Sequence, residues 1–282
     1  MLIELAIGDA YGAGFEYASD RIVRKHNDLG RYIQHPRHGI IPGCYTDDTQ
    51  MSIAIAEAIV EGDPWTPEVL ALRFVTAFKR DPREGYASRF YDFLTRVSDG
   101  AEFLDTIRPD SDKSGAAMRA CPIGVHRSVA DVIDRCRLQA TLTHNTLDGI
   151  NAAVAAALMT HYCLFSIGPK AQLPEFLNSY VPGPWARPWK GKVGAKGLIS
   201  VRAAATALHS NSTMSDLLKA CIAFAGDVDT VATIALAAGS CSTEIEQDLP
   251  EHLFSGLEDG RFGRGFLREL DKRLLASASE NS

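Results

Sequence analysis

The segment Ile150-Asn-Ala-Ala-Val-Ala-Ala-Ala-Leu-Met-Thr-His-Tyr-Cys-Leu-Phe165 is the most apolar stretch of this chain and decides its fold class. Its apolar residues recur with helical spacing instead of alternating, and its alanines favour helix formation and close packing. Thr160, His161 and Tyr162 interrupt the run, which is well short of the ~20 apolar residues that a membrane span needs. The segment therefore predicts a core helix in a protein that does not cross a membrane.

Other apolar segments show the same helical spacing, while few stretches have the Val-, Ile- and Thr-rich alternation of a half-buried strand. The clearest helical segments are Met51–Val60, Pro67–Phe78, Tyr86–Val97, Val201–Leu208, Met214–Phe224 and Val231–Ala238. Loops are expected at Gly39–Gly43, Lys79–Gly85, Arg108–Gly115 and Val181–Gly197, which are rich in glycine, proline or charge. The pattern predicts an all-α fold.

Length and composition favour a globular enzyme-sized unit. At 282 residues the chain fits one or at most two compact units, and we expect a single domain over residues 1–282 with a frayed polar tail, Ser277–Ser282. The net charge of −6 leaves no basic excess to hold a nucleic-acid backbone. The opening Met1–Asp9 lacks the features of a secretory signal, so a cytoplasmic protein is expected.

The six cysteines are scattered singly, without a Cys-x-x-Cys pair or a neighbouring pair of histidines. Neither a zinc site nor a disulfide framework is indicated. We expect reduced and mostly buried thiols.

Two acidic segments each precede an apolar helical run. Thr46-Asp47-Asp48-Thr49 comes before Met51–Val60, and Asp227-Val228-Asp229-Thr230 leads into Val231–Ala238. Taken singly, each is explained by helix capping, because Asp and Thr accept the unpaired N–H groups of a first turn and complement the helix dipole.

Taken together, the two segments suggest a metal site. Four carboxylates brought to one poorly solvated place would repel one another strongly, and bound cations would resolve that repulsion. Oxygen ligands without a neighbouring Cys or His select hard divalent ions such as Mg²⁺ or Mn²⁺. The spacing does not show whether the two segments meet.

A third segment, Gly8–Glu16, is rich in glycine and ends in a glutamate. Its glycines permit close backbone approach, although helix packing followed by a surface glutamate explains it equally simply. With five other motifs it resembles the ADP-ribosylglycohydrolase family, which includes dinitrogenase-reductase-activating glycohydrolase and the ADP-ribosylarginine and ADP-ribosylserine hydrolases. The six motifs are Gly-Asp-Ala-x-Gly-x-x-x-Glu at 8–16, Tyr-Thr-Asp-Asp-Thr-Gln at 45–50, Asp-Pro-Arg-x-Gly-Tyr at 81–86, Ser-Gly-Ala-Ala-Met-Arg-x-x-Pro-Ile-Gly at 114–124, Thr-His-Asn at 143–145 and Gly-Asp-x-Asp-Thr at 226–230.

The resemblance runs in the family's order from residue 8 to about 240 and implies a compact orthogonal multi-helix domain. It implies two Mg²⁺ ions, or Mn²⁺ in their place, at the base of an ADP-ribose cleft. The metal ligands carried over by motif are Thr46, Asp47, Asp48, Asp227, Asp229 and Thr230. Glu16 would lie at the metal site near the scissile ribose.

The resemblance also implies contacts to ADP-ribose. Ser114 and Gly115 fall in the loop that cradles the diphosphate through backbone N–H groups in the family, and Met118 follows in the same motif. His144 falls in the segment that lines the cleft, where a structural hydrogen-bonding role is about equally expected.

This chain departs from the family pattern in three places. The last motif usually begins with two glycines and carries a threonine between its aspartates, where this chain has Ala225-Gly226 and Val228. The phosphate loop, often Tyr-Gly-Asn-Gly, reads Asp112-Lys113-Ser114-Gly115. After Thr-His-Asn, the usual His-Pro is replaced by Thr146-Leu147. These changes suggest a divergent subgroup with its own preferred substrate.

The family chemistry implies that a metal-activated water attacks the anomeric carbon of ADP-ribose through a transition state like an oxocarbenium ion. Asp47 and Asp229 would then be catalytic through the metals. Glu16 is the candidate switch at the ribose, and Asp81 is the candidate acid or base. Asp81 has an alternative, a simple ion pair with an arginine on a solvated loop.

The predicted function is hydrolysis of the bond between ADP-ribose and a modified acceptor, most readily arginine on a protein. Serine, a small molecule or a nucleic-acid end remain open as acceptors, and nucleic acid is otherwise not expected as a partner. A non-catalytic ADP-ribose-binding relative and a two-metal hydrolase of pyrophosphates are the alternatives. The oligomeric state is not encoded in these motifs, and a monomer is the working expectation.

The loop Val181–Gly197 carries Trp185 and Trp189 in a run of poor periodicity. It is interpreted as a lid or a surface excursion. For the two tryptophans, packing in the core or in the lid is favoured over stacking on adenine.

Overall fold

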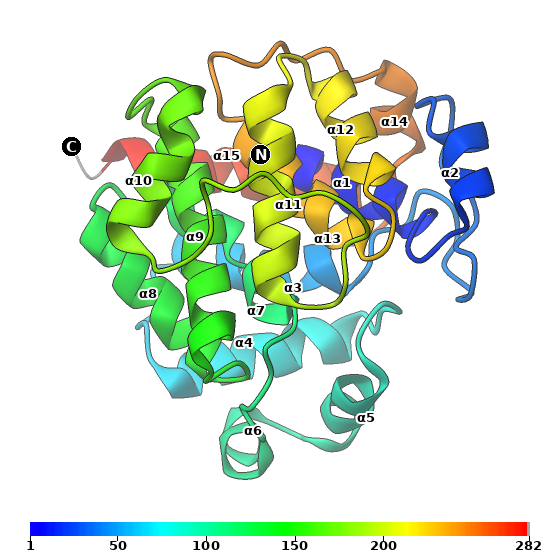
Figure 1. Ribbon diagram of the computed structural model, residues 1–282. Coiled ribbons are helices and arrows are strands. Elements are labelled where there is room, and N and C mark those ends of the chain that lie inside the picture. The colour runs from blue at the N-terminus through cyan, green and yellow to red at the C-terminus, as the bar shows by residue number, and fades with distance from the viewer. Residues whose placement is uncertain (281–282) are drawn as a thin grey trace.

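In the computed structural model the expected core helix is α9, Leu147–Leu164 (Figure 1). The side chain of Thr146 caps it by accepting a hydrogen bond from the N–H of Gly149. This cap explains why the helix begins three residues before the apolar run. Every residue from Ala152 to Cys163 is buried, so the prediction of a core helix is confirmed.

The structure describes residues 1–280, with side chains to Ala278, and in that range it contains fifteen α-helices, two 3₁₀ helices and no β-strand. The helices are α1 (Leu2–Ala13), α2 (Asp20–His26), α3 (Asp47–Val60), α4 (Pro67–Arg80), α5 (Ser88–Arg96), α6 (Gly100–Thr106), α7 (Gly115–Met118), η1 (Cys121–Val125), α8 (Val129–Thr141), α9, η2 (Lys170–Gln172), α10 (Leu173–Tyr180), α11 (Gly197–Ser210), α12 (Met214–Ala223), α13 (Val228–Gly239), α14 (Glu251–Gly256) and α15 (Arg264–Glu280). The all-α prediction is confirmed, and each predicted helical segment corresponds to one helix.

Helices α1 and α13 form the closest pair at the centre of the molecule. A Cβ atom on Gly8 would lie 2.7 Å from the backbone of Ala232, and one on Gly12 would lie 2.4 Å from Cα of Asp229. The glycines of α1 therefore allow the two backbones to touch. This contact places the end of α1 beside the start of α13.

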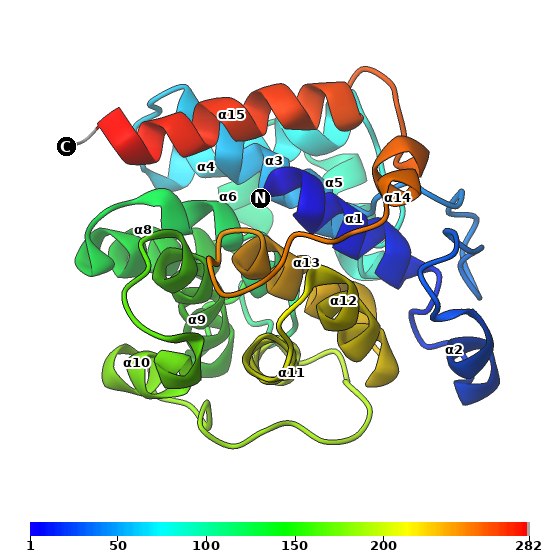
Figure 2. The same cartoon turned by 90° about the horizontal axis from the view of Figure 1, so that it is seen from above.

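The other helices surround this pair. Helix α15 lies across α3 on the face opposite α11 (Figure 2). Helices α5 and α6 lie at the lower end, below α4, and α6 packs closely against α4 (Figure 1). The buried hydrophobic residues of the described chain form one continuous cluster.

One predicted boundary is wrong. Helix α5 is shorter than the segment Tyr86–Val97, because Tyr86 is buried before the helix and donates its hydroxyl hydrogen to Gln50, 2.6 Å away. Helix α15 continues to Glu280, and the expected fraying of the tail from Ser277 stays a prediction. Residues 281–282 lie outside the described part.

The loop Val181–Gly197 packs against the body instead of extending from it. Trp185 is buried and donates its indole N–H to the carbonyl of Val181, and Trp189 donates its indole N–H to Gly191. These contacts support core packing over adenine stacking. Val193 exchanges backbone hydrogen bonds with Ala225 and Asp227, so the loop buttresses the start of α13.

Within residues 1–280, none of the helices combines the length and the apolar character that crossing a membrane requires. All six cysteines are free thiols, and four of them are buried. The expectation of reduced, mostly buried thiols agrees with this arrangement.

Candidate metal and nucleotide site

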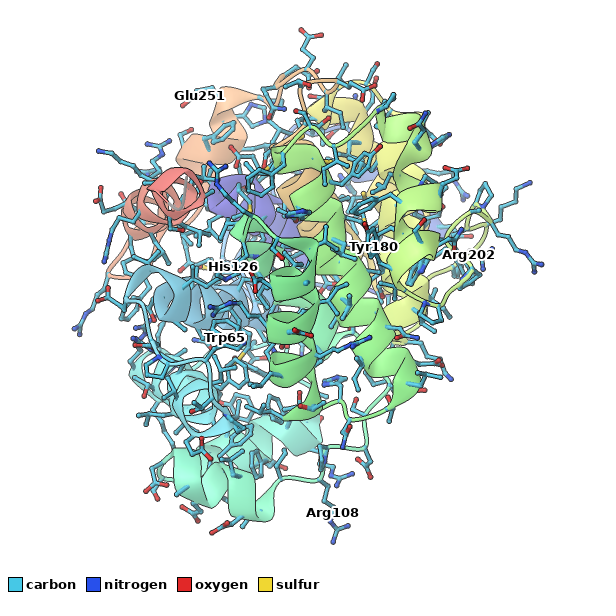
Figure 3. The ribbon with its side chains drawn as sticks, turned by 90° about the vertical axis from the view of Figure 1, so that its left-hand side faces the viewer. Trp65, Arg108, His126, Tyr180, Arg202 and Glu251 are labelled. Atoms are coloured by element: carbon cyan, nitrogen blue, oxygen red, sulfur yellow. The ribbon has the colours of Figure 1, made fainter. Side chains whose placement is uncertain are left out.

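A cavity of about 910 Å³ opens between the starts of α3 and α13 and the helix α5. Small-molecule sites usually have volumes of ~300–1,000 Å³. Its inner side is lined by buried carboxylates and its outer side by exposed residues of α5 and of the segment 106–113. Arg108, on that outer side, points into solvent at the lower end of the molecule (Figure 3).

The cavity brings together most residues that the sequence singled out. Those that line it are Glu16, Asp47, Asp48, Ser114, Gly115, Met118, His144, Asp227, Asp229 and Thr230. Thr46 and Asp81 are not among the lining residues.

The start of α3 is held by Asp9, whose role the sequence did not reveal. The fully buried carboxylate of Asp9 accepts four hydrogen bonds, from the N–H and hydroxyl groups of Thr46 and Thr49, at 2.6–2.9 Å. Asp9 thus shares the capping of this helix with Thr46, whose hydroxyl accepts a hydrogen bond from the N–H of Asp48. The side chains of Asp47 and Asp48 line the cavity. This placement is the one that a metal site requires.

The start of α13 is set by a left-handed turn. Ala225 has φ of 59° and Gly226 has φ of 95°, and a Cβ on Gly226 would lie 1.9 Å from the carbonyl oxygen of Val193. Only glycine fits the second position. The turn aims Asp227 and Asp229 into the cavity.

The two acidic helix starts line the same cavity, and the cluster of close carboxylates joins Glu16 to the α13 pair without Asp47 or Asp48. One oxygen from each of Glu16, Asp227 and Asp229 lies within 4.8 Å of the other two. Burial raises the pKa of Asp227 to about 7, and the charge of Glu16 adds to this rise. Burial also raises the pKa of Asp48 well above its usual range. The charges of its neighbour Asp47 and of Asp227 at the start of α13 add to this rise.

Two buried carboxylate oxygens, Oδ2 of Asp48 and Oδ1 of Asp229, have no hydrogen-bond partner within the described structure. Buried acceptors are normally satisfied, and leaving them unsatisfied is costly. A hard divalent cation would satisfy both and would offset the repulsion among the carboxylates. The donor set therefore fits Mg²⁺ or Mn²⁺.

Glu16 reaches the site from the turn that follows α1. The N–H of Tyr17 donates to the carbonyl of Gly226 over 2.8 Å, which ties this segment to the turn before α13. The Glu16 carboxylate is held by His35, whose Nε2 lies 2.7 Å from Oε2. His35 was not expected from the sequence, because it belongs to none of the six motifs.

The loop that contains Ser114 and Gly115 was expected to bind a diphosphate through its backbone N–H groups, and one of these groups is not available. The N–H of Ser114 donates to the carbonyl of Ala195 at 3.0 Å, so this N–H group is already occupied. The hydroxyl of Ser114 instead interacts with Asp227. Gly115 is packed against the ring of His144, whose Cε1 would be 3.0 Å from an added Cβ, so a larger residue does not fit without movement.

His144 is buried and neutral. Burial and the positive charge of Arg119 lower its pKa to about 3. Arg119 donates to the hydroxyl of Thr143, and that hydroxyl lies 2.7 Å from Nδ1 of His144. This chain of hydrogen bonds from Arg119 through Thr143 fixes the orientation of the His144 ring. Both the structural and the cavity-lining interpretations of His144 apply.

Asp81 lies outside the lining of the cavity, and the acid or base role expected of it stays a prediction. Arg83 binds its carboxylate through Nε at 2.8 Å and Nη2 at 2.7 Å, and Arg83 also pairs with Glu258. This is the ion pair that the sequence left as the alternative. A carboxylate held in such a fork outside the cavity is poorly placed to exchange a proton with a ligand.

Comparisons with known proteins agree with this architecture. The family model described as ADP-ribosylglycohydrolase matches residues 1–282. The chain is 31% identical over 144 residues to ADP-ribosylhydrolase ARH3 of Xenopus tropicalis, covering 48% of this chain and 41% of that protein. It is 22% identical over 253 residues to ADP-ribosylarginine hydrolase Tri1 of Pseudomonas putida, covering 83% and 67%. The match thus spans less than half of that ARH3 relative.

A solved structure described as an ADP-ribosylglycohydrolase-related protein complex has a TM-score of 0.75 to this chain at 20% identity. The alignment covers 98% of this chain and 96% of that one, which shows a shared fold. The family match extends over the whole chain, and the acidic helix starts that the motifs specify meet in one cavity. This chain belongs to the ADP-ribosylglycohydrolase family.

Proposed function

We propose that this protein is a hydrolase, folded as a single domain, that cleaves the glycosidic bond between ADP-ribose and an acceptor with the help of divalent metal ions. The observation that carries the proposal is the convergence of Glu16, Asp227 and Asp229 with the start of α3 at the inner side of one cavity. A dense carboxylate cluster is suited to an anomeric carbon that develops positive charge.

The proposed metal ligands are the six residues of the two helix starts. Thr46 remains in this set because its hydroxyl, although it donates to Asp9, keeps lone pairs for a cation. Two Mg²⁺ ions, with Mn²⁺ as substitute, would balance the four aspartates. Bound by these residues, such ions would supply Lewis-acid chemistry, lowering the pKa of a water molecule toward neutrality.

The protein's own groups divide the remaining tasks. Glu16 is the proposed acid or base, since Asp81 is held by Arg83 outside the cavity. The neutral ring of His144 is the proposed donor to an oxygen of the ligand, through Nε2 when Nδ1 accepts from Thr143. Gly115 and Met118 shape the wall for the diphosphate.

We propose arginine-linked ADP-ribose on protein as the substrate. The Pseudomonas putida relative is described as an ADP-ribosylarginine hydrolase, which supports this choice. The description ADP-ribosylhydrolase ARH3 does not name the acceptor of those relatives. Serine-linked ADP-ribose is therefore tested in the same assay.

The test is release of intact ADP-ribose from arginine- and serine-modified protein with Mg²⁺. Asp229→Ala is expected to lower the rate by more than about 100-fold, because metal stabilisation of charge is worth several kcal/mol. Asp216→Ala, a matched change in the exposed first turn of α12, is expected to leave the rate unchanged. Formation of AMP would indicate a pyrophosphate hydrolase, and ADP-ribose binding by calorimetry without turnover would indicate a binding protein.

A further inference from the structure

His35 is a buried histidine on the segment between α2 and α3, with only 4% of its surface exposed. Its Nδ1 accepts hydrogen bonds from the backbone N–H groups of Arg37 at 2.9 Å and His38 at 3.0 Å. A nitrogen that accepts from two donors carries no hydrogen, so the ring hydrogen lies on Nε2. The backbone of this segment thus sets the tautomer of His35.

Nε2 of His35 lies 2.7 Å from Oε2 of Glu16 and donates its hydrogen to it. Glu16 stands beside Asp227 and Asp229, two carboxylates whose charge repels it. Its backbone lies in the turn that follows α1, and a glutamate side chain there has several staggered rotamers. The hydrogen bond from a rigid, buried ring opposes the repulsion and selects one of these rotamers.

We propose that His35 is a positioning residue that holds the Glu16 carboxylate at the metal and ribose end of the cavity. This inference rests on the proposed function. Through His35, the conformation of residues 35–38 determines where Glu16 lies. Among the described residues, the hydrogen bonds of the ring reach Glu16 and its own loop, so it acts on the reaction through Glu16.

A structural alternative is that His35 merely anchors its own loop through Nδ1. Two substitutions separate the roles, because each retains one of the two nitrogen functions. His35→Asn keeps a short acceptor for the N–H groups of Arg37 and His38 but does not reach Glu16. His35→Gln keeps a donor at the distance of Nε2 but loses the acceptor at Nδ1.

If His35 positions Glu16, His35→Asn is expected to lower kcat/KM and Mn²⁺ affinity by about 10- to 100-fold, the usual effect of losing a partner of a metal-site carboxylate. His35→Gln should stay within about threefold of wild type, since its amide donates in place of the ring. The reverse order, with Asn active and Gln impaired, would show a purely structural role and overturn the proposal. Thermal unfolding of both variants checks that they fold.

Two further measurements complete the test. In a Glu16→Gln background, His35→Asn should cause no additional loss of Mn²⁺ affinity, and an undiminished loss would contradict action through Glu16. Nitrogen-15 NMR of His35 should show hydrogen on Nε2, and hydrogen on Nδ1 would also contradict it. The calorimetric and NMR measurements test the role of His35 without requiring catalytic turnover. If the wild-type protein released no ADP-ribose, that result would refute the proposed function and leave the test of His35 intact.

Discussion

At the scale of single residues, the turn before α13 shows how backbone conformation fixes the site. Ala225 occupies a position where the family commonly has glycine, and it adopts a left-handed φ of 59°. Such a conformation costs a non-glycine residue roughly 1–2 kcal/mol. The turn is held by bonds from the N–H of Val193 to Ala225 and from the N–H of Asp227 to Val193, so the surrounding structure sustains the strain.

Ala225→Gly is therefore expected to leave stability unchanged or raise it by up to about 1 kcal/mol, since the relief of strain exceeds the entropy that glycine costs. Gly226→Ala should lower the free energy of unfolding by about 2–5 kcal/mol, because its φ of 95° is strained and its Cβ would meet Val193. Urea unfolding measures both. Equal destabilisation by the two changes would refute the assignment of strain to Ala225.

At the scale of elements, the site depends on α1 as much as on the two acidic helix starts. Asp9 caps α3, and Gly12 lets α1 touch α13 at Asp229, so one helix positions both carboxylate sets. The sequence predicted the helices through their spacing of apolar residues. It did not predict the capping role of Asp9, because a buried aspartate in an apolar helix shows its partners only after folding.

Gly12→Ala tests this coupling. Its Cβ would lie 2.4 Å from Cα of Asp229, so α13 must move, at a cost of about 1–3 kcal/mol in unfolding free energy. Mn²⁺ affinity by calorimetry should fall as well, because Asp229 shifts with the helix. Gly39→Ala is the matched control, since nothing lies within 4 Å of its added Cβ, and it should change stability by less than about 0.5 kcal/mol. If Gly12→Ala lowered stability but left Mn²⁺ affinity unchanged, the claim that α1 positions the carboxylates of the site would be wrong.

At the scale of the whole molecule, the decisive fact is the meeting of segments some 180 residues apart in the chain. Spacing along the sequence could place Asp47 and Asp229 on helix starts, but only the packing of α1 against α13 and α3 brings those starts together. The resemblance to the family supplied that expectation. His35 stayed hidden because its importance arises from one contact with Glu16, 19 residues earlier in the chain and on the other side of α2.

The carboxylate cluster also makes stability depend jointly on pH and metal. Burial raises the pKa of Asp227 to about 7 and raises those of Asp47, Asp48 and Asp229 well above their usual range. The unfolded pKa is ~3.9, so the favourable contribution of each group is complete below that value and is lost as pH rises through the folded pKa.

Metal-free protein is thus expected to lose stability between pH 4 and 8, and Mg²⁺, which competes with protons for the same oxygens, should restore it most at the upper end. At 100 times its Kd, Mg²⁺ adds about 2.7 kcal/mol. Thermal unfolding with EDTA or Mg²⁺ at pH 5 and pH 8 measures this. The Mg²⁺-induced rise in Tm should be larger at pH 8, and it should vanish in Asp229→Asn. A rise that is equal at both pH values would mean that Mg²⁺ binds outside the cluster of buried carboxylates.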